Sequence, residues 1–195
     1  QYVLKNLTYD IELQELTSII KRLIDTKYIV PGYALTKAEV LDNNKRKDIM
    51  LYISKNPGIH GRAIRDYLKL GANEYFWHIS ILEKFELIKT ITFENNNGLF
   101  LNRSFQDYEI PLIFFQMNKT QTILKQCEKT ALSMLQITKS TKMHYYTVKK
   151  YVNALLENDM LIKIEEEGKE KYRANIDFIL KLKKIINSSF FDDFM

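Results

Sequence analysis

The same pattern of residues occurs twice in this chain, and this repeat restricts the possible folds more than any other feature. Residues 82–89 read LEKFELIK, and residues 156–163 read LENDMLIK. Each copy follows an aromatic-rich stretch with helical spacing and precedes a short strand, a turn and a second strand. Self-similarity at a fixed spacing is typical of a structural unit that is present more than once. The sequence therefore predicts two similar units in tandem.

The first copy is predicted to form three helices followed by a β-hairpin. Ile49, Met50 and Ile53 recur at helical spacing, which indicates an amphipathic first helix. The segment 56–58, Asn-Pro-Gly, is expected to end that helix, because proline cannot continue the hydrogen-bond ladder and glycine permits a left-handed turn. Gly71 is expected to take a positive φ before the third helix. The predicted elements are helices at 45–55, 62–68 and 73–85, a strand at 88–93, a turn at 94–98 and a strand at 99–102.

The second copy repeats this order with weaker turn signals. Its predicted elements are helices at 119–129, 131–139 and 143–158, and strands at 162–165 and 171–173 around a turn at 165–168. An ungapped alignment from Leu82 places Asn153 where the first copy has the apolar Ile79, so a one-residue shift is expected in the third helix. The candidate core residues are Ile123, Leu124, Cys127, Leu132, Leu135, Ile137, Val148, Val152, Leu155 and Leu156.

Three helices followed by a hairpin make a winged helix. The expected fold class is mainly α with small β-hairpins (α+β), as tandem winged helix-turn-helix domains plus N- and C-terminal amphipathic helices. The expected divisions are 1–40 (N-terminal helix and connector), 41–104 (first winged helix), 105–118 (apolar linker), 119–174 (second winged helix) and 175–195 (C-terminal helix and tail). The linker is too apolar to be flexible and is expected to pack between the units.

Both terminal helices are predicted from apolar residues at steps of three and four. In the N-terminal helix these are Tyr9, Leu13, Leu16, Ile20 and Leu23, and in the C-terminal helix they are Ile176, Ile179, Leu182 and Ile186, followed by the segment 188–191, Ser-Ser-Phe-Phe. Either helix could pair with its counterpart in a homodimer or cover the core of its own domain. The heptad pattern is too short to choose between the two.

Composition excludes several classes of protein. The single cysteine, Cys127, excludes an internal disulfide and a cysteine-based zinc site. No signal-peptide pattern and no apolar run of about 18 residues is present, so a cytoplasmic protein without membrane contact is expected. The start at Gln1 suggests a piece of a longer protein. His60, His78 and His144 are not spaced as metal ligands, and no phosphate loop, nucleophile elbow or catalytic carboxylate pair is present. The chain is expected to be no enzyme and to bind no cofactor, metal or small-molecule ligand.

The first unit resembles archaeal winged helix-turn-helix transcriptional regulators of the broad ArsR/MarR type. The residues that carry the resemblance are Leu41-Asp42-Asn43, Arg46, Tyr52-Ile53, Asn56-Pro57-Gly58-Ile59-His60, Trp77-His78, Leu82-Glu83 and Leu87-Ile88-Lys89. They cover about a third of the chain, and the second unit is a looser match to the same fold. The resemblance implies a DNA-binding regulator that often acts as a dimer. This chain departs from the family in having Glu74, Phe76 and Ser80 on the recognition face, where basic or small polar residues are common.

A winged helix places its third helix in the major groove, which displays a distinct donor and acceptor pattern for each base pair. Asn73 can bond adenine and Glu74 can accept from cytosine, while arginines of the first two helices are placed to meet phosphates. Phe76 and Trp77 can touch a thymine methyl, or they can simply pack in a core or an interface. The candidate DNA-binding residues of the first unit are Arg46, Arg62, Asn73, Glu74, Phe76, Trp77, Ser80 and, in the wing at 95–97, Asn96.

The second unit carries more positive charge around its third helix. The net charge is +4 for 119–174 and +3 for 41–104, within a chain total of +5. The acidic turn at 165–167 would repel a duplex, so contacts through helices rather than wings are expected. A solvated charged face is the alternative reading of the lysines. The candidate DNA-binding residues here are Lys139, Lys142, His144, Tyr145, Lys149, Lys150 and Lys169.

The sequence thus favours sequence-specific binding of double-stranded DNA by a transcriptional regulator, with recognition helices in the major groove. The alternative is a tandem winged-helix scaffold that mediates protein–protein assembly without contacting nucleic acid. The acidic wing and the aromatic face of the first unit support this alternative.

Overall fold

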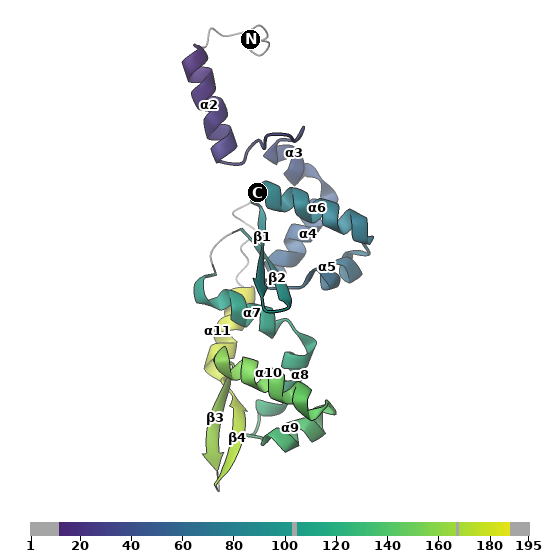
Figure 1. Cartoon of the computed structure of the whole chain (residues 1–195), viewed down its shortest axis with the longest axis vertical. Helices are drawn as coiled ribbons and strands as arrows, with labels where there is room; N and C mark the ends of the chain where they lie inside the picture. Colours follow the sequence, from purple (N-terminus) through teal and green to yellow (C-terminus); the bar gives the residue numbers. More distant parts are fainter. Residues whose placement is uncertain (1–11, 103–104, 167, 188–195) are drawn as a thin grey trace.

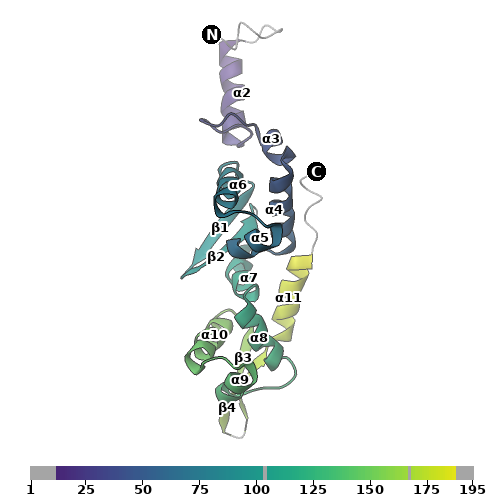
Figure 2. The same cartoon turned by 90° about the vertical axis from the view of Figure 1, so that its right-hand side faces the viewer.

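A computed structural model describes residues 12–102, 105–166 and 168–187 of the chain. The fold is mainly helical with two small antiparallel hairpins, which confirms the expected fold class. The elements are α2 (Leu13–Asp25), α3 (Lys37–Asp42), α4 (Asn44–Lys55), α5 (Gly61–Leu68), α6 (Ala72–Lys84), β1 (Ile88–Phe93), β2 (Asn96–Leu101), η1 (Gln106–Tyr108), α7 (Glu109–Phe115), α8 (Asn118–Cys127), α9 (Met134–Thr141), α10 (Tyr145–Glu157), β3 (Leu161–Glu166), β4 (Lys169–Ala174) and α11 (Ile176–Asn187). The molecule is elongated, with α2 at one end and the β3–β4 hairpin at the other (Figures 1 and 2).

The second unit repeats the first at a constant spacing of 73 residues from α5 onward. The bounds of α5 and α9, of α6 and α10, and of the paired hairpin strands all differ by this number. The isolated bridge Ile59↔Leu99 corresponds in the same way to Leu132↔Tyr172. Even the left-handed residue that ends the second helix recurs, as Lys69 and Lys142. Each unit therefore has the same order of three helices, a hairpin and a short third strand that bridges to it, which is the arrangement of a winged helix.

The expected one-residue shift in the third helix of the second unit is confirmed. Val148, Val152 and Leu155 are fully buried, whereas Asn153 is exposed. Leu155, rather than Leu156, therefore corresponds to Leu82 of the first unit. The sequence alignment of the two LE…LIK segments pairs residues 74 apart, whereas the structural repeat is 73 residues. Residues that are identical in that alignment therefore lie on different faces of the two third helices.

Several turns differ from the expectation. Gly58 has the predicted positive φ of 84°, but before α6 it is Lys69, with φ of 54°, that takes the left-handed conformation, while Gly71 has φ of −63°. The first hairpin turns at residues 94–95, so the predicted turn at 94–98 is wrong. The helix predicted at 131–139 begins later, at α9, because the Ser133 hydroxyl caps it by accepting from the Gln136 N–H.

The segment between the units forms α7, which packs on one face of the β1–β2 hairpin. The Phe93 and Phe114 rings meet edge to face at 6.0 Å, and Lys89 Nζ lies 2.5 Å from Glu109 Oε1. Gly98, in the middle of β2, has no side chain, and a Cβ there would collide with Ile113 of α7. The predicted packing of this segment between the two units is confirmed.

The described residues form two hydrophobic cores, one mainly in each unit, and α7 belongs to the second core together with Phe100 of β2. Ile179 and Leu182 of α11 are buried in this second core, so α11 covers its own unit. Helix α2, by contrast, has no buried residue, and Leu13 is 64% exposed. Leu135 is 65% exposed, so its assignment to the core was wrong. Tyr9 and the segment 188–191 lie outside the described residues.

Candidate nucleic-acid interface

The outward side of α10 is a row of three polar or aromatic residues. Tyr146, Lys150 and Asn153 follow each other at steps of four and three, opposite the buried Val148 and Val152. Residues at these steps lie on one helix face. All three side chains are exposed to solvent, Tyr146 at 73%.

Four exposed lysines lie in and beside this row. Lys149 and Lys150 belong to α10, while Lys139 and Lys142 lie at the end of the neighbouring helix α9 (Figure 1). Within the described ranges none of the four has a carboxylate within 4.0 Å, in contrast to the lysines of both hairpins. Unpaired cations on one surface can neutralise phosphates without first breaking an internal ion pair.

His144 and Tyr145, also expected in the site, lie at the start of α10. His144 is the N-cap residue and its ring stacks on the Tyr146 ring at 5.6 Å. Tyr145 is 39% exposed and meets Tyr146 edge to face at 5.7 Å. The three rings form an aromatic cluster beside the four lysines.

The same surface of the first unit has a different character. At the 73-residue spacing, Phe76 and Trp77 occupy the positions of Lys149 and Lys150. They are 63% and 56% exposed, so their packing within the core of the unit is excluded. The third helices of the two units thus present an aromatic face and a basic face in equivalent places.

Four of the other first-unit candidates are exposed, and two of these already have a partner: Arg62, Asn73, Glu74 and Ser80. Arg62 forms an ion pair with Asp66, with Nε 3.8 Å from Oδ2, and Asp66 stands where the second unit has Lys139. Glu74 caps its own helix, because its carboxylate accepts from the Gly71 N–H at 3.4 Å. Asn73 and Ser80 are exposed on the outward side of α6.

Arg46 was expected to meet a phosphate, and the structure contradicts this. Its side chain is 3% exposed, Nε donates to the Val40 carbonyl at 2.8 Å, and Nη2 donates to the Glu39 carbonyl at 3.3 Å. Its guanidinium also lies 5.7 Å from the centre of the Trp77 ring. Arg46 therefore joins α3, α4 and α6 in the interior. The hydrophobic pattern of α4 could not predict this burial, because it depends on hydrogen bonds from the Arg46 guanidinium to carbonyls of another helix, α3.

His78 of α6 lies near Arg46 and is also buried. Its ring meets Trp77 at 4.8 Å, and Nε2 is 4.0 Å from Glu74 Oε1. Burial and the nearby Arg46 lower the pKa of His78 below its ordinary value of 6.5. The imidazole is therefore neutral at physiological pH and belongs to the packing of α6.

The prediction that Asn96 lies at the tip of the first wing is also wrong. It opens β2, pairs with Phe93 and is half-buried on the hairpin face that turns toward α7. Because strand residues alternate between faces, Asn97 points the other way and is exposed. The turn is shorter than predicted, so Asn96 became part of the strand.

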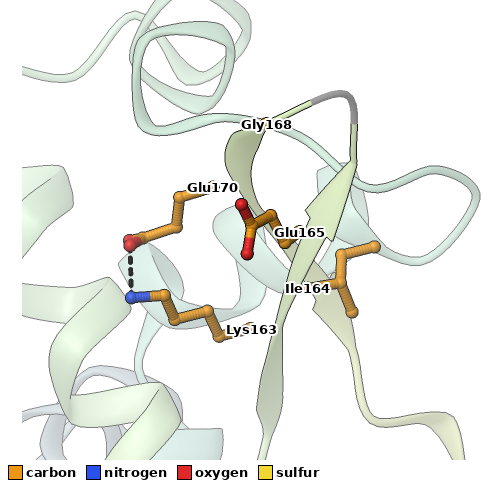
Figure 3. A pocket seen from close by; sticks show the side chains of 5 residues that line it. All are labelled: Lys163, Ile164, Glu165, Gly168 and Glu170. Atoms are coloured by element: carbon orange, nitrogen blue, oxygen red, sulfur yellow. Dashed lines mark ion pairs between the residues drawn. The ribbon is translucent and has the colours of Figure 1, made fainter.

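The second wing divides its charges between two faces. On one face Lys163 forms an ion pair with Glu170, and the carboxylate of Glu165 lies beside them (Figure 3). Hydrogen bonds from Lys163 and Tyr172 lower the pKa of the Glu170 carboxyl. This face is acidic overall. Glu167, also expected in the acidic turn, lies outside the described residues.

The opposite face of this wing is basic. Lys169, Lys171 and Arg173 alternate with the residues of the acidic face, and Glu166 forms an ion pair with Lys171 at 2.7 Å. Lys169, a candidate from the sequence, is exposed at the start of β4. The turn sequence indicated a uniformly acidic wing, whereas strand alternation separates three cations from most of the carboxylates.

Sequence reasoning missed Tyr146, Asn153 and Arg173. The facing of α10 was uncertain by one residue, and this hid the outward row. The signal that could have found it is the Val148, Val152 and Leu155 spacing, which fixes the buried side of the helix. Arg173 could have been found from the alternation of strand residues.

Other kinds of site are not indicated in the described ranges. No group of three or more His, Cys, Asp or Glu residues is placed to hold a metal ion there. None of the helices described is both long and apolar enough to cross a bilayer. Cys127 is buried in the second core, and burial raises the pKa of its thiol to about 12, so it is a packing residue.

Comparison with known proteins gives one informative likeness. No family model matches the chain. The uncharacterized HTH-type transcriptional regulator MJ1398 of Methanocaldococcus jannaschii is 30% identical over 150 residues. These residues are 77% of this chain and 38% of that protein, so the chain spans well under half the length of this curated relative. Among solved structures, the DIP2311 protein from Corynebacterium diphtheriae is 13% identical with a TM-score of 0.26, over 78% of this chain and 28% of that one. The latter likeness is too weak to bear on the fold.

Proposed function

We propose that this chain binds double-stranded DNA as a helix-turn-helix transcriptional regulator, with α10 of the second unit in the major groove. The observation that carries the proposal is a set of four exposed lysines in and beside the outward row of α10, none of which forms an ion pair with another described residue. A helix fits the major groove, and cations beside it can meet the phosphates on either side. The description of the archaeal relative as an HTH-type transcriptional regulator supports the same function.

The proposal includes further expectations drawn from the sequence. The protein would act in the cytoplasm, without catalysis, as a regulator of the ArsR/MarR type. Residues 41–104 and 119–174 would be its two winged-helix domains. The second would be the main DNA-binding unit, with Lys169 and Arg173 of its wing reaching the backbone.

The first unit supports a second candidate function, protein–protein contact. Phe76 and Trp77 stand where the second unit has lysines, and Tyr67 of α5 is 66% exposed. Exposed aromatic residues are enriched at protein interfaces, and they offer nothing to a phosphate. In this version of the scaffold hypothesis, the first unit binds a protein while the second binds DNA.

The decisive test is the salt dependence of duplex binding. Log affinity should fall with log salt at a slope of about −3.6 if four phosphates are neutralised. Replacing Lys149 and Lys150 by alanine should make the slope shallower by about 1.8. The matched control is Lys183→Ala with Lys184→Ala on α11, which removes the same charge from an exposed helix elsewhere and should leave the slope nearly unchanged.

Two outcomes would reject the proposal. Equal effects of the two double variants would mean that net charge, and not the α10 surface, attracts the duplex. Absence of duplex binding at low salt would leave the protein-contact function as the better reading of both units.

We also propose that the chain forms a homodimer, as expected from its terminal helices. Of these, α11 covers its own core, whereas α2 exposes an apolar stripe that includes Leu13, Ile19 and Ile20. The contact is therefore assigned to α2. Ile20→Glu should shift the mass in solution from two chains to one by sedimentation, and a wild-type mass of one chain would refute the assignment.

A further inference from the structure

The outward row of α10 has a composition that suits reading bases rather than only holding phosphates. We infer that Asn153 reads an adenine in the major groove, with Tyr146 contacting a neighbouring base pair of the same half-site and Lys150 meeting a phosphate beside them. This inference rests on the proposed DNA binding and adds the kind of sequence that is bound. It is supported by the exposed position of Asn153 on α10 and by the different residues at the equivalent positions of α6.

Asn153 is free to form two new hydrogen bonds. It lies in the interior of α10, is exposed, and within the described residues its side-chain amide has no hydrogen-bond partner. Asparagine is a poor residue for a helix interior because it favours other backbone conformations, so helix stability does not account for it. Its Oδ1 can accept from adenine N6–H while Nδ2–H donates to adenine N7, a pairing that the other bases do not offer in the major groove.

Tyr146 and Lys150 place this amide within a reading row of suitable length. Tyr146 to Asn153 spans seven residues of helix, about 10 Å, or about three base-pair steps. The Tyr146 ring is supported by the His144 ring at 5.6 Å, so it is held at the start of the helix where it can touch a thymine methyl. Lys150, between the two, remains a phosphate contact.

The first unit lacks this arrangement. At the 73-residue spacing Asn73, Trp77 and Ser80 replace Tyr146, Lys150 and Asn153. A serine hydroxyl cannot donate and accept across both adenine positions with the same discrimination, and the indole replaces the cation. The preference for adenine should therefore depend on the second unit alone.

Selection from randomised duplexes with the intact chain tests the inference. The wild-type chain should enrich sites with one invariant A·T pair, and replacing that pair with G·C should weaken binding by about 5- to 150-fold. Asn153→Ala should lose this discrimination while keeping its salt slope, because no charge is removed. Asn73→Ala, an exposed asparagine on the equivalent helix of the first unit, is the matched control and should retain the preference.

The possible failures are distinguishable. Lysine-dependent binding in which Asn153→Ala keeps the wild-type base preference would overturn this inference and leave the proposed function intact. Enrichment that is lost in Asn73→Ala instead would assign the reading to the first unit. A chain that binds no duplex would overturn both the inference and the proposed function.

Discussion

Replacing Ile113 by alanine should destabilise both units together, because α7 is part of the structure of each. Ile113 is 2% exposed and lies over Gly98 of the first hairpin while it belongs to the second core. Removal of three buried carbons costs about 2.4 kcal/mol at about 0.8 kcal/mol each, and the cavity left behind brings the loss to about 3 kcal/mol. For a urea dependence of about 3 kcal/mol per molar, the unfolding midpoint should fall by about 1 M.

Urea unfolding followed by two signals measures this effect. Trp77 is the single tryptophan of the chain and lies in the first unit, whereas circular dichroism reports the helices of both. The two transitions should move together in Ile113→Ala. Ile162→Ala is the control, since this isoleucine is 43% exposed and should cost less than about 1 kcal/mol. A Trp77 transition that stays at its wild-type midpoint would show that α7 is only a linker, and the reasoning would be refuted.

Three further outcomes are expected. Arg46→Ala should lower the free energy of unfolding by about 1–3 kcal/mol, because the Val40 and Glu39 carbonyls lose a buried donor, yet the salt slope of duplex binding should not change; a shallower slope would return Arg46 to the interface. Since the folded pKa of His78 is lowered, its contribution to stability is complete above pH 6.5 and is lost as pH falls through the folded value. Denaturation at pH 7 and pH 5 should therefore show a smaller loss in His78→Gln than in the wild type, and equal losses would contradict the assignment. Cys127 should resist thiol reagents in the native protein and react on unfolding, because its thiol is buried with a pKa raised to about 12; rapid labelling without denaturant would disprove its burial.

Much of the fold could be predicted from sequence because apolar spacing and turn residues agree in the first unit. The strand at 88–93 has the bounds of β1, and Ile49, Met50 and Ile53 are buried as expected. The glycine rule failed at Gly71, since Lys69 takes the left-handed conformation instead. A side chain with φ near 54° is tolerated there because the helix end and the next helix fix the turn from both sides.

The candidate site was less predictable because it depends on which way individual side chains point. Arginine is a common phosphate ligand, but the carbonyls of Glu39 and Val40 in the preceding helix hold the Arg46 side chain in the interior. Asn96 moved from a turn into a strand when the hairpin proved shorter. Asn153 seemed misplaced among apolar residues until the register of α10 placed it outward. For Arg46 a tertiary contact decides the direction, whereas for Asn96 and Asn153 the local register decides it, and an error of one residue reverses the facing.

The covering of the β1–β2 hairpin by α7 means that the two hairpins differ in their tolerance to insertion. Extra residues at Gly168 would extend a ribbon that projects from the end of the molecule (Figure 1). Extra residues beside Asn95 would lengthen a ribbon whose last paired residue, Phe93, already packs against Phe114 of α7. The second hairpin is therefore the place where residues can be added with the least effect on the packing between the two units.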